Sequence, residues 1–117
     1  MDSIDSIILE LVNAQGIKIN AETIYEGPAN LFFGIESVGG KLFLTKDALL
    51  FYSHGINLSS RKKFTVIKLD EVIEAKISFL TFFNLTTKTR KYKFVGGLSG
   101  KKKWVNLINK QVALINK

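Results

Sequence analysis

Hydrophobic residues follow a helical period at the start of the chain and an alternating period through most of its length. In the first part the apolar positions are Ile4, Ile7, Ile8, Leu11 and Val12. Their spacing puts them on one stripe and predicts an amphipathic helix over residues 2–15. Asp2 or Ser3 can cap this helix, and Gly16 is a natural end for it. The stripe needs a cover, supplied either by the rest of the domain or by a second chain.

From residue 17 onward, apolar and polar residues alternate, and many of the apolar ones are β-branched or aromatic. This pattern predicts short strands separated by turns. The predicted strands cover residues 29–36, 41–45, 48–53, 64–69, 72–79, 81–87 and 91–95. Gly39-Gly40 is the expected tight turn between the first two strands. Seven short strands favour a β-sandwich or a partly open barrel.

The last segment returns to a helical period. Trp104, Ile108, Val112 and Ile115 follow one another at spacings of four, four and three residues. They predict an amphipathic helix over residues 100–116, with Trp104 as a packing anchor. Such a helix can close the open end of the barrel. We therefore expect an N-terminal helix in residues 1–16 and a mainly β domain in residues 17–117.

The composition excludes several classes of protein. A chain of 117 residues suits one domain, and 46% apolar with 23% charged residues is typical of a globular one. The absence of cysteine excludes disulfide scaffolds, thiol nucleophiles and cysteine-based zinc sites. The single histidine, His54, has no second histidine to share a metal and no nucleophile elbow beside it. We expect no enzyme activity, no metal and no cofactor.

The chain also lacks targeting features. Its first residues are acidic rather than basic, and its longest unbroken apolar run covers only residues 48–52. Neither a secretory signal nor a membrane-spanning helix is therefore expected. We expect a cytoplasmic protein whose membrane contact is peripheral.

The formal net charge of +7 is distributed unevenly along the chain. Residues 1–60 hold three lysines and seven carboxylates, whereas residues 61–117 hold fourteen basic and three acidic side chains. This asymmetry predicts a surface that attracts anions. The alternative is that single lysines decorate solvated edges.

Several segments in this order resemble the GRAM domain, a family of the pleckstrin-homology-like superfold. They are YEGPAN (25–30), GIESVGGKLFLT (34–45), LLFYSH (49–54), IKLDEV (67–72), YKFV (92–95) and KKW (102–104). The resemblance covers residues 22–110 and is closest to small stand-alone bacterial members. It implies a bent seven-stranded β-sandwich capped by a C-terminal helix. For function it implies a non-enzymatic module that binds membrane lipids or protein partners.

The chain departs from the lipid-binding pattern of that superfold at two places. Lipid-binding pleckstrin-homology domains carry several lysines or arginines between the first two strands, whereas residues 37–40 have none. Many GRAM domains have a basic residue before the third strand, where this chain has Asp47. The expected ligand is therefore an anionic lipid in general, and the expected site lies in the C-terminal half.

The predicted anion site consists of basic residues around the last strand and the last helix. They are Lys88, Arg90, Lys91, Lys93, Lys101, Lys102 and Lys103, with Arg61, Lys62 and Lys63 as a secondary cluster. Lys101–Lys103 occupy the first helical turn, where each cation costs about 0.3–1 kcal/mol because the helix dipole is already positive there. A bound anion would remove that cost, although solvent screening of an exposed triplet reduces it as well.

A second possible interaction surface is the apolar run from Phe79 to Phe83. Its large side chains are Phe79, Leu80, Phe82 and Phe83. On an extended strand Phe82 and Phe83 point to opposite faces, so one of them lies outside the barrel, and the N-terminal helix is a candidate cover for it. Together with that helix, this run is the alternative site for a protein partner or a homo-oligomer. Nucleic acid is not expected, because no RNP, KH or helix-turn-helix signature is present.

Overall fold

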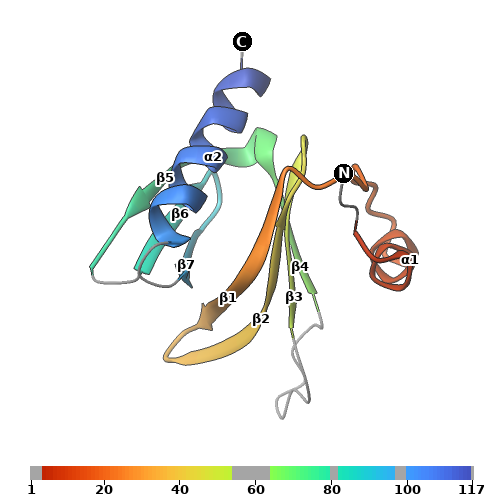
Figure 1. Ribbon diagram of the computed structural model, residues 1–117, viewed down its shortest axis with the longest axis horizontal. Helices are drawn as coiled ribbons and strands as arrows, with labels where there is room; N and C mark the ends of the chain where they lie inside the picture. The colour runs from red at the N-terminus through yellow and green to blue at the C-terminus, as the bar shows by residue number, and fades with distance from the viewer. Residues whose placement is uncertain (1–3, 54–63, 80–81, 97–99, 117) are drawn as a thin grey trace.

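The alternating pattern forms one antiparallel sheet in the computed structural model, which describes residues 4–53, 64–79, 82–96 and 100–116 (Figure 1). Its strands are β1 (Tyr25–Phe33), β2 (Glu36–Leu44), β3 (Ala48–Ser53), β4 (Phe64–Lys68), β5 (Val72–Ile77), β6 (Phe82–Thr87) and β7 (Lys91–Val95). A 3-10 turn, η1 (Leu69–Glu71), connects β4 to β5. The strand order is β4-β3-β2-β1-β7-β6-β5. The seven predicted strands are confirmed within the described residues.

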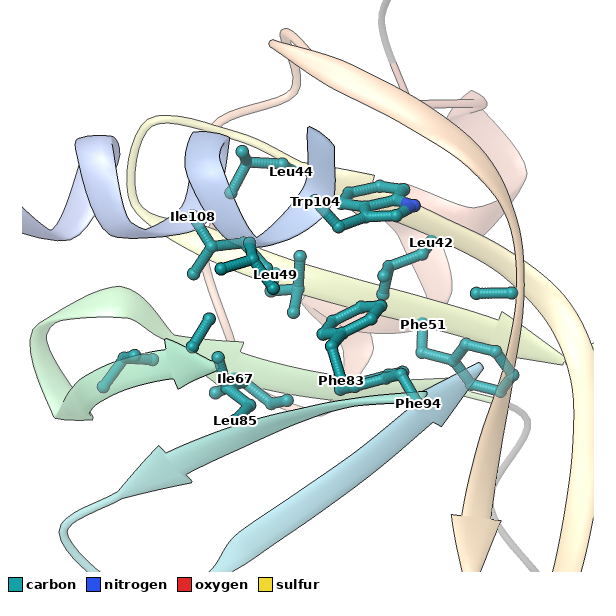
Figure 2. Packing of buried hydrophobic residues seen from close by; sticks show 14 of the residues in the cluster. Leu42, Leu44, Leu49, Phe51, Ile67, Phe83, Leu85, Phe94, Trp104 and Ile108 are labelled. Carbon is teal, nitrogen blue, oxygen red and sulfur yellow. The ribbon is translucent and has the colours of Figure 1, made fainter. Parts of the chain in front are cut away.

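The main core lies between the two halves of this bent sheet and the C-terminal helix α2 (Gly100–Ile115). Figure 2 shows Trp104 of α2 beside Leu42 and Ile108 of α2 beside Leu49 of the sheet. Phe83 and Phe94 stack with ring centroids 5.2 Å apart. Trp104 is 1% exposed, so its predicted role as a packing anchor is confirmed. The helix therefore closes the sheet as the sequence predicts.

The first hairpin turn lies at Gly34, not at Gly39-Gly40. Gly34 has a positive φ of 67°, a backbone conformation that glycine adopts without strain. Gly39 and Gly40 instead continue β2, opposite Asn30 and Ala29 of β1. Gly40 marks a close approach of β2 to β3 rather than a turn, which is another common reason for a glycine inside a strand.

The N-terminal helix α1 (Ser6–Ala14) covers the outer face of β2, β3 and β4. Asp5 caps it by accepting a hydrogen bond from the Ile7 N–H at 2.8 Å, so the described helix begins later than the predicted residue 2. Val12 is fully buried in a second apolar cluster with Phe43 and Leu50. In Figure 1, α1 accordingly lies on the side of the sheet opposite α2. Among the described residues, no helix is long and apolar enough to cross a bilayer.

Two hydrogen bonds from one side-chain amide connect α2 to the edge strand β5. The Asn109 side chain accepts a hydrogen bond from the Ala75 N–H and donates one to the Ala75 C=O, both at 2.8 Å. Ala75 lies opposite Leu85 of β6. Opposite residues in antiparallel strands alternate between hydrogen-bonded and non-hydrogen-bonded pairs, and at Ala75 the backbone N–H and C=O are not used for hydrogen bonds to β6. The Asn109 side chain thus provides hydrogen-bond partners for the Ala75 N–H and C=O, which would otherwise be unpaired at the edge of the sheet.

Candidate functional site

The outer face of β5, β6 and β7 carries cations, whereas the inner face carries the core. Phe94 is buried inside, and Lys91 and Lys93 point outward because side chains alternate along a strand. On β6, Asn84 lies opposite Lys93 and Thr86 lies opposite Lys91. The two lysines of β7 therefore share one exposed surface, as the sequence predicts.

Two phenyl rings form the apolar base of this surface. Phe32 of β1 and Phe82 of β6 have ring centroids 5.6 Å apart. The Lys93 Nζ lies 4.4 Å from the centroid of Phe82 and 5.2 Å from that of Phe32. Each ammonium–ring contact at an exposed site contributes about 0.5–1 kcal/mol. The ammonium group is thus held over an aromatic pair while its chain remains exposed.

The cationic surface continues onto the edge strand β5. Lys76 lies opposite Asn84, so Lys76, Asn84 and Lys93 form one row across three strands. Strands are spaced about 4.8 Å apart, which puts the Cα atoms of the two lysines about 10 Å apart with an amide between them. We call Lys76, Lys91 and Lys93 with Phe32 and Phe82 the cationic face. Glu74, opposite Thr86, is its acidic neighbour.

Lys41, a lysine on β2, differs from the lysines of the cationic face. Lys41 lies 3.6 Å from the Glu26 carboxylate and 5.3 Å from the Phe43 ring centroid, so its charge is balanced locally. Among the described residues, no such ion pair involves a lysine of the cationic face. Within the described residues, the cationic face therefore carries an excess of positive charge.

The lysines of the α2 start lie beside the end of β7. A Cβ built on Gly96 would be 3.3 Å from the backbone nitrogen of Lys101, which shows how closely the helix follows the strand. The Lys103 Nζ lies 4.6 Å from the ring centroid of Tyr25, and that ring forms a T-shaped pair with Trp104. We call Lys101, Lys102 and Lys103 the α2 lysines.

The β6–β7 turn carries Lys88 and Arg90 at the other end of β7. The Lys88 N–H donates to the Glu71 C=O at 3.0 Å, which joins this turn to η1. The Arg90 guanidinium lies 5.7 Å from the ring centroid of Tyr92, a residue that packs against the main core. Lys91 and Val95 are about 13 Å apart along the strand. The predicted basic residues are therefore spread along β7, with Lys88 and Arg90 far from the α2 lysines.

The Phe79–Phe83 run is divided between core and surface. Phe83 is fully buried, Phe82 belongs to the cationic face, and Phe79 is 71% exposed. Phe82 does not lie under α1, because α1 packs on the other half of the sheet. Leu80, the secondary cluster Arg61, Lys62 and Lys63, and also His54 lie outside the described residues.

Sequence reasoning missed Lys76, Asn84 and Phe32. The alternation of Glu74 and Lys76 in the fifth strand signals an exposed side chain, but which strand lies beside it depends on pairing across the sheet. Within the described residues, no group of three or more His, Cys, Asp or Glu side chains could hold a metal ion. The groups on the cationic face are ammonium, amide and phenyl groups, which suit an anionic ligand with apolar parts.

The sequence matches no known family profile and no curated protein. Solved structures do match it. The linker-DH/PH domains of p115-RhoGEF superpose with a TM-score of 0.69 at 20% identity, over 96% of this chain and 36% of that one. The N-terminal PH domain of human ARAP2 superposes with a TM-score of 0.65 at 12% identity, over 78% of this chain and 80% of that one.

A third match is the DH/PH domain of human ARHGEF11, in a ternary complex with human RhoA and its inhibitor. Its TM-score is 0.66 at 18% identity, and the match covers 80% of this chain but only 29% of that one. The chain thus spans less than a third of the ARHGEF11 chain. At such identities these matches establish the fold alone, which is pleckstrin-homology-like.

Proposed function

We propose that this pleckstrin-homology-like domain is a non-enzymatic binding module of the GRAM type that associates peripherally with anionic membrane lipids. The observation that carries the proposal is the cationic face, where Lys93 rests on Phe32 and Phe82 with Lys76 and Lys91 beside it. The α2 lysines add further positive charge near the end of β7.

The energetics of a charged membrane surface favour this arrangement. Each lysine close to an anionic bilayer contributes about 1 kcal/mol, so several lysines together can hold a small domain there. The aliphatic parts of lysine side chains and the two phenyl rings suit the boundary between headgroups and water. Ammonium groups donate charge-assisted hydrogen bonds to phosphate or carboxylate oxygens. Binding, rather than catalysis, is the chemistry that this face supports.

Vesicle co-sedimentation tests the proposal. We expect the protein to bind vesicles that contain phosphatidylserine and to leave phosphatidylcholine vesicles unbound. The double substitution Lys91→Glu with Lys93→Glu should weaken binding at least about tenfold, since two favourable contacts become repulsive. The matched control, Lys18→Glu with Lys46→Glu, changes the net charge equally at two exposed lysines outside the cationic face. Equal binding to both vesicle types, or equal losses in both variants, would refute the proposal.

A second candidate function is protein interaction or self-association. The observations that favour it are the exposed Phe79 and the outward side of α1, where Ile7 is 66% and Leu11 is 40% exposed. The ARHGEF11 domains are found in a complex with RhoA, which shows that another protein of this fold meets a protein partner. Light scattering checks self-association: a dimer supports this function, and a monomer with lipid binding supports the first.

A further inference from the structure

We propose that Asn84 of β6, between Lys76 of β5 and Lys93 of β7, is the centre of a binding site for a phosphomonoester, a phosphate group with a single ester bond. In a membrane this group is found on lipids whose headgroup is the phosphate alone, as in phosphatidic acid. The inference rests on the proposed function, because the site lies within the cationic face, and it names the class of lipid that this face selects.

Asn84 is the residue of this site that folding does not explain. It lies within β6 between the buried Phe83 and Leu85, so its side chain points to the outer face of the sheet. Asparagine is depleted in strands, where β-branched and aromatic residues are favoured. The side chain is half-buried, yet its amide forms no hydrogen bond with another described residue. This amide can therefore bind a ligand without giving up a contact within the described chain.

Two lysines flank this amide, one on each neighbouring strand. Asn84 lies opposite Lys76 on one side and opposite Lys93 on the other. Strands are about 4.8 Å apart, so each lysine Cα lies about 5 Å from the Asn84 Cα. Both lysine side chains are exposed, and the Lys93 Nζ is held 4.4 Å from the ring centroid of Phe82. An amide between two ammonium groups is thus in place before any ligand binds.

A phosphomonoester matches these donors in charge and in the number of its oxygens. It carries about −1.5 to −2 charges at pH 7 and offers three strong acceptor oxygens. The ammonium groups of Lys76 and Lys93 can balance this charge through charge-assisted hydrogen bonds, while the Asn84 N–H donates to a remaining oxygen. A phosphate with two ester bonds carries less charge and has fewer free oxygens. It would leave one of these donors unused.

The neighbouring row of the cationic face suits such a group less well. Lys91 lies opposite Thr86, and Thr86 lies opposite Glu74, so that row contains one lysine and one carboxylate. The carboxylate repels a doubly charged anion. The row through Asn84 instead has a lysine on each side of the amide. The positive charge on the cationic face is therefore most concentrated around Asn84.

The phenyl rings beside the site favour a lipid over a soluble phosphate. Phe32 and Phe82 are in contact, and the Lys93 ammonium lies over both rings, so apolar surface adjoins the cation directly. When the headgroup is a phosphate alone, the apolar part of the lipid begins close to the phosphate and can contact these rings. Figure 1 shows α1 on the far side of the molecule from β5, β6 and β7, so α1 does not stand between this face and a bilayer.

A pair of uncharged substitutions tests the site by vesicle co-sedimentation. Phosphatidylcholine vesicles contain either phosphatidic acid or about twice the mole fraction of phosphatidylserine, which matches the vesicle charge. We expect the unsubstituted protein to bind the phosphatidic acid vesicles at least about fivefold more tightly. Asn84→Val should abolish this preference and leave binding to phosphatidylserine unchanged. The matched control, Asn30→Val, should keep the preference, because Asn30 is exposed on β1 and lies opposite Gly39 and Val95 rather than lysines.

Inorganic phosphate distinguishes a soluble ligand from a lipid. We expect it to shift the NMR signals of the Asn84 side-chain amide, but only at concentrations far above those at which phosphatidic acid in vesicles binds. Equal affinity for inorganic phosphate would overturn the assignment to a lipid. Equal effects of the two valine variants would overturn the role of Asn84.

The same vesicles separate this inference from the proposed function. Equal binding to phosphatidic acid and phosphatidylserine at matched charge would overturn the phosphomonoester site and leave electrostatic membrane association intact. Failure to bind either kind of vesicle would overturn both. Because neither valine variant changes the net charge, a loss specific to Asn84→Val cannot arise from weaker general attraction to the bilayer.

Discussion

Gly40 shows how one residue sets the distance between two strands. It lies in β2 opposite Ser53 of β3, and a Cβ at this position would meet the Tyr52 carbonyl oxygen. The same Cβ would lie 2.8 Å from the Phe51 ring and 2.9 Å from the Ser53 Cα. Backbone atoms cannot move aside as a flexible side chain can. Glycine is therefore required here by close packing, not by its backbone dihedrals.

Replacing this glycine tests that reading. We expect Gly40→Ala to lower the free energy of unfolding by about 1–3 kcal/mol, the usual cost of forcing extra atoms into a packed site. Gly39→Ala is the matched control, because its Cβ would meet only the Asn30 side chain at an ordinary 3.7 Å. Urea unfolding of the two variants measures the difference. Equal stabilities would contradict the packing argument.

At the scale of elements, the contact between α2 and β5 depends on Asn109. Its amide satisfies both backbone groups of Ala75 on the edge strand. Asn109→Ala removes both hydrogen bonds, and we expect a loss of about 1–3 kcal/mol in unfolding free energy, because partly buried polar groups lose their partners. The unfolding free energy of Asn109→Asp should lie between those of the unsubstituted protein and Asn109→Ala. A carboxylate still accepts a hydrogen bond from the Ala75 N–H, but it repels the Ala75 C=O. Asn106→Ala, at an exposed position on the same helix, should leave thermal stability unchanged.

Hydrophobic periodicity was sufficient to predict the bounds of some elements but not the position of the first hairpin turn. The predicted bounds of β3 and β7 match those of the structure, and α2 ends one residue before its predicted end. Alternation and helical spacing are local properties, so they can be read directly from neighbouring residues. The position of the β1–β2 turn was predicted wrongly. A glycine pair is typical of a turn, and only the pairing of neighbouring strands shows that it lies within a strand. Gly34 was the available signal.

At the scale of the whole molecule, the charge distribution predicts how binding responds to salt. Raising the ionic strength from about 0.1 to about 1 M shortens the Debye length from about 10 to about 3 Å. We expect affinity for phosphatidylserine vesicles to fall at least about tenfold over this range, as several exposed lysines lose their attraction. Apolar insertion alone is not weakened by salt in this way. Co-sedimentation across a salt series measures the change, and a flat series would argue against electrostatic docking.

The positions of the candidate residues in the fold could be predicted from the sequence only in part. Outward-facing Lys91 and Lys93 follow from alternation on one strand. Lys76 and Phe32 could not be joined to them, because they come from strands far apart in the sequence. Nor does the sequence show that α1 packs against Phe43 and Leu50, although it does predict that the apolar stripe of α1 must be covered. Both half-sheets present apolar outer residues, so a local pattern cannot choose between them.

The sequence alone determined the order and type of the elements, the burial of Trp104 and the excess of positive charge in the second half of the chain. These follow from short-range periodicity and from counting. Only the tertiary structure decided that β7 pairs with β1, which brings Phe32, Phe82 and Lys93 together. Strand pairing between distant segments depends on competing burial across the whole sheet, and that competition is resolved only when the chain closes on itself.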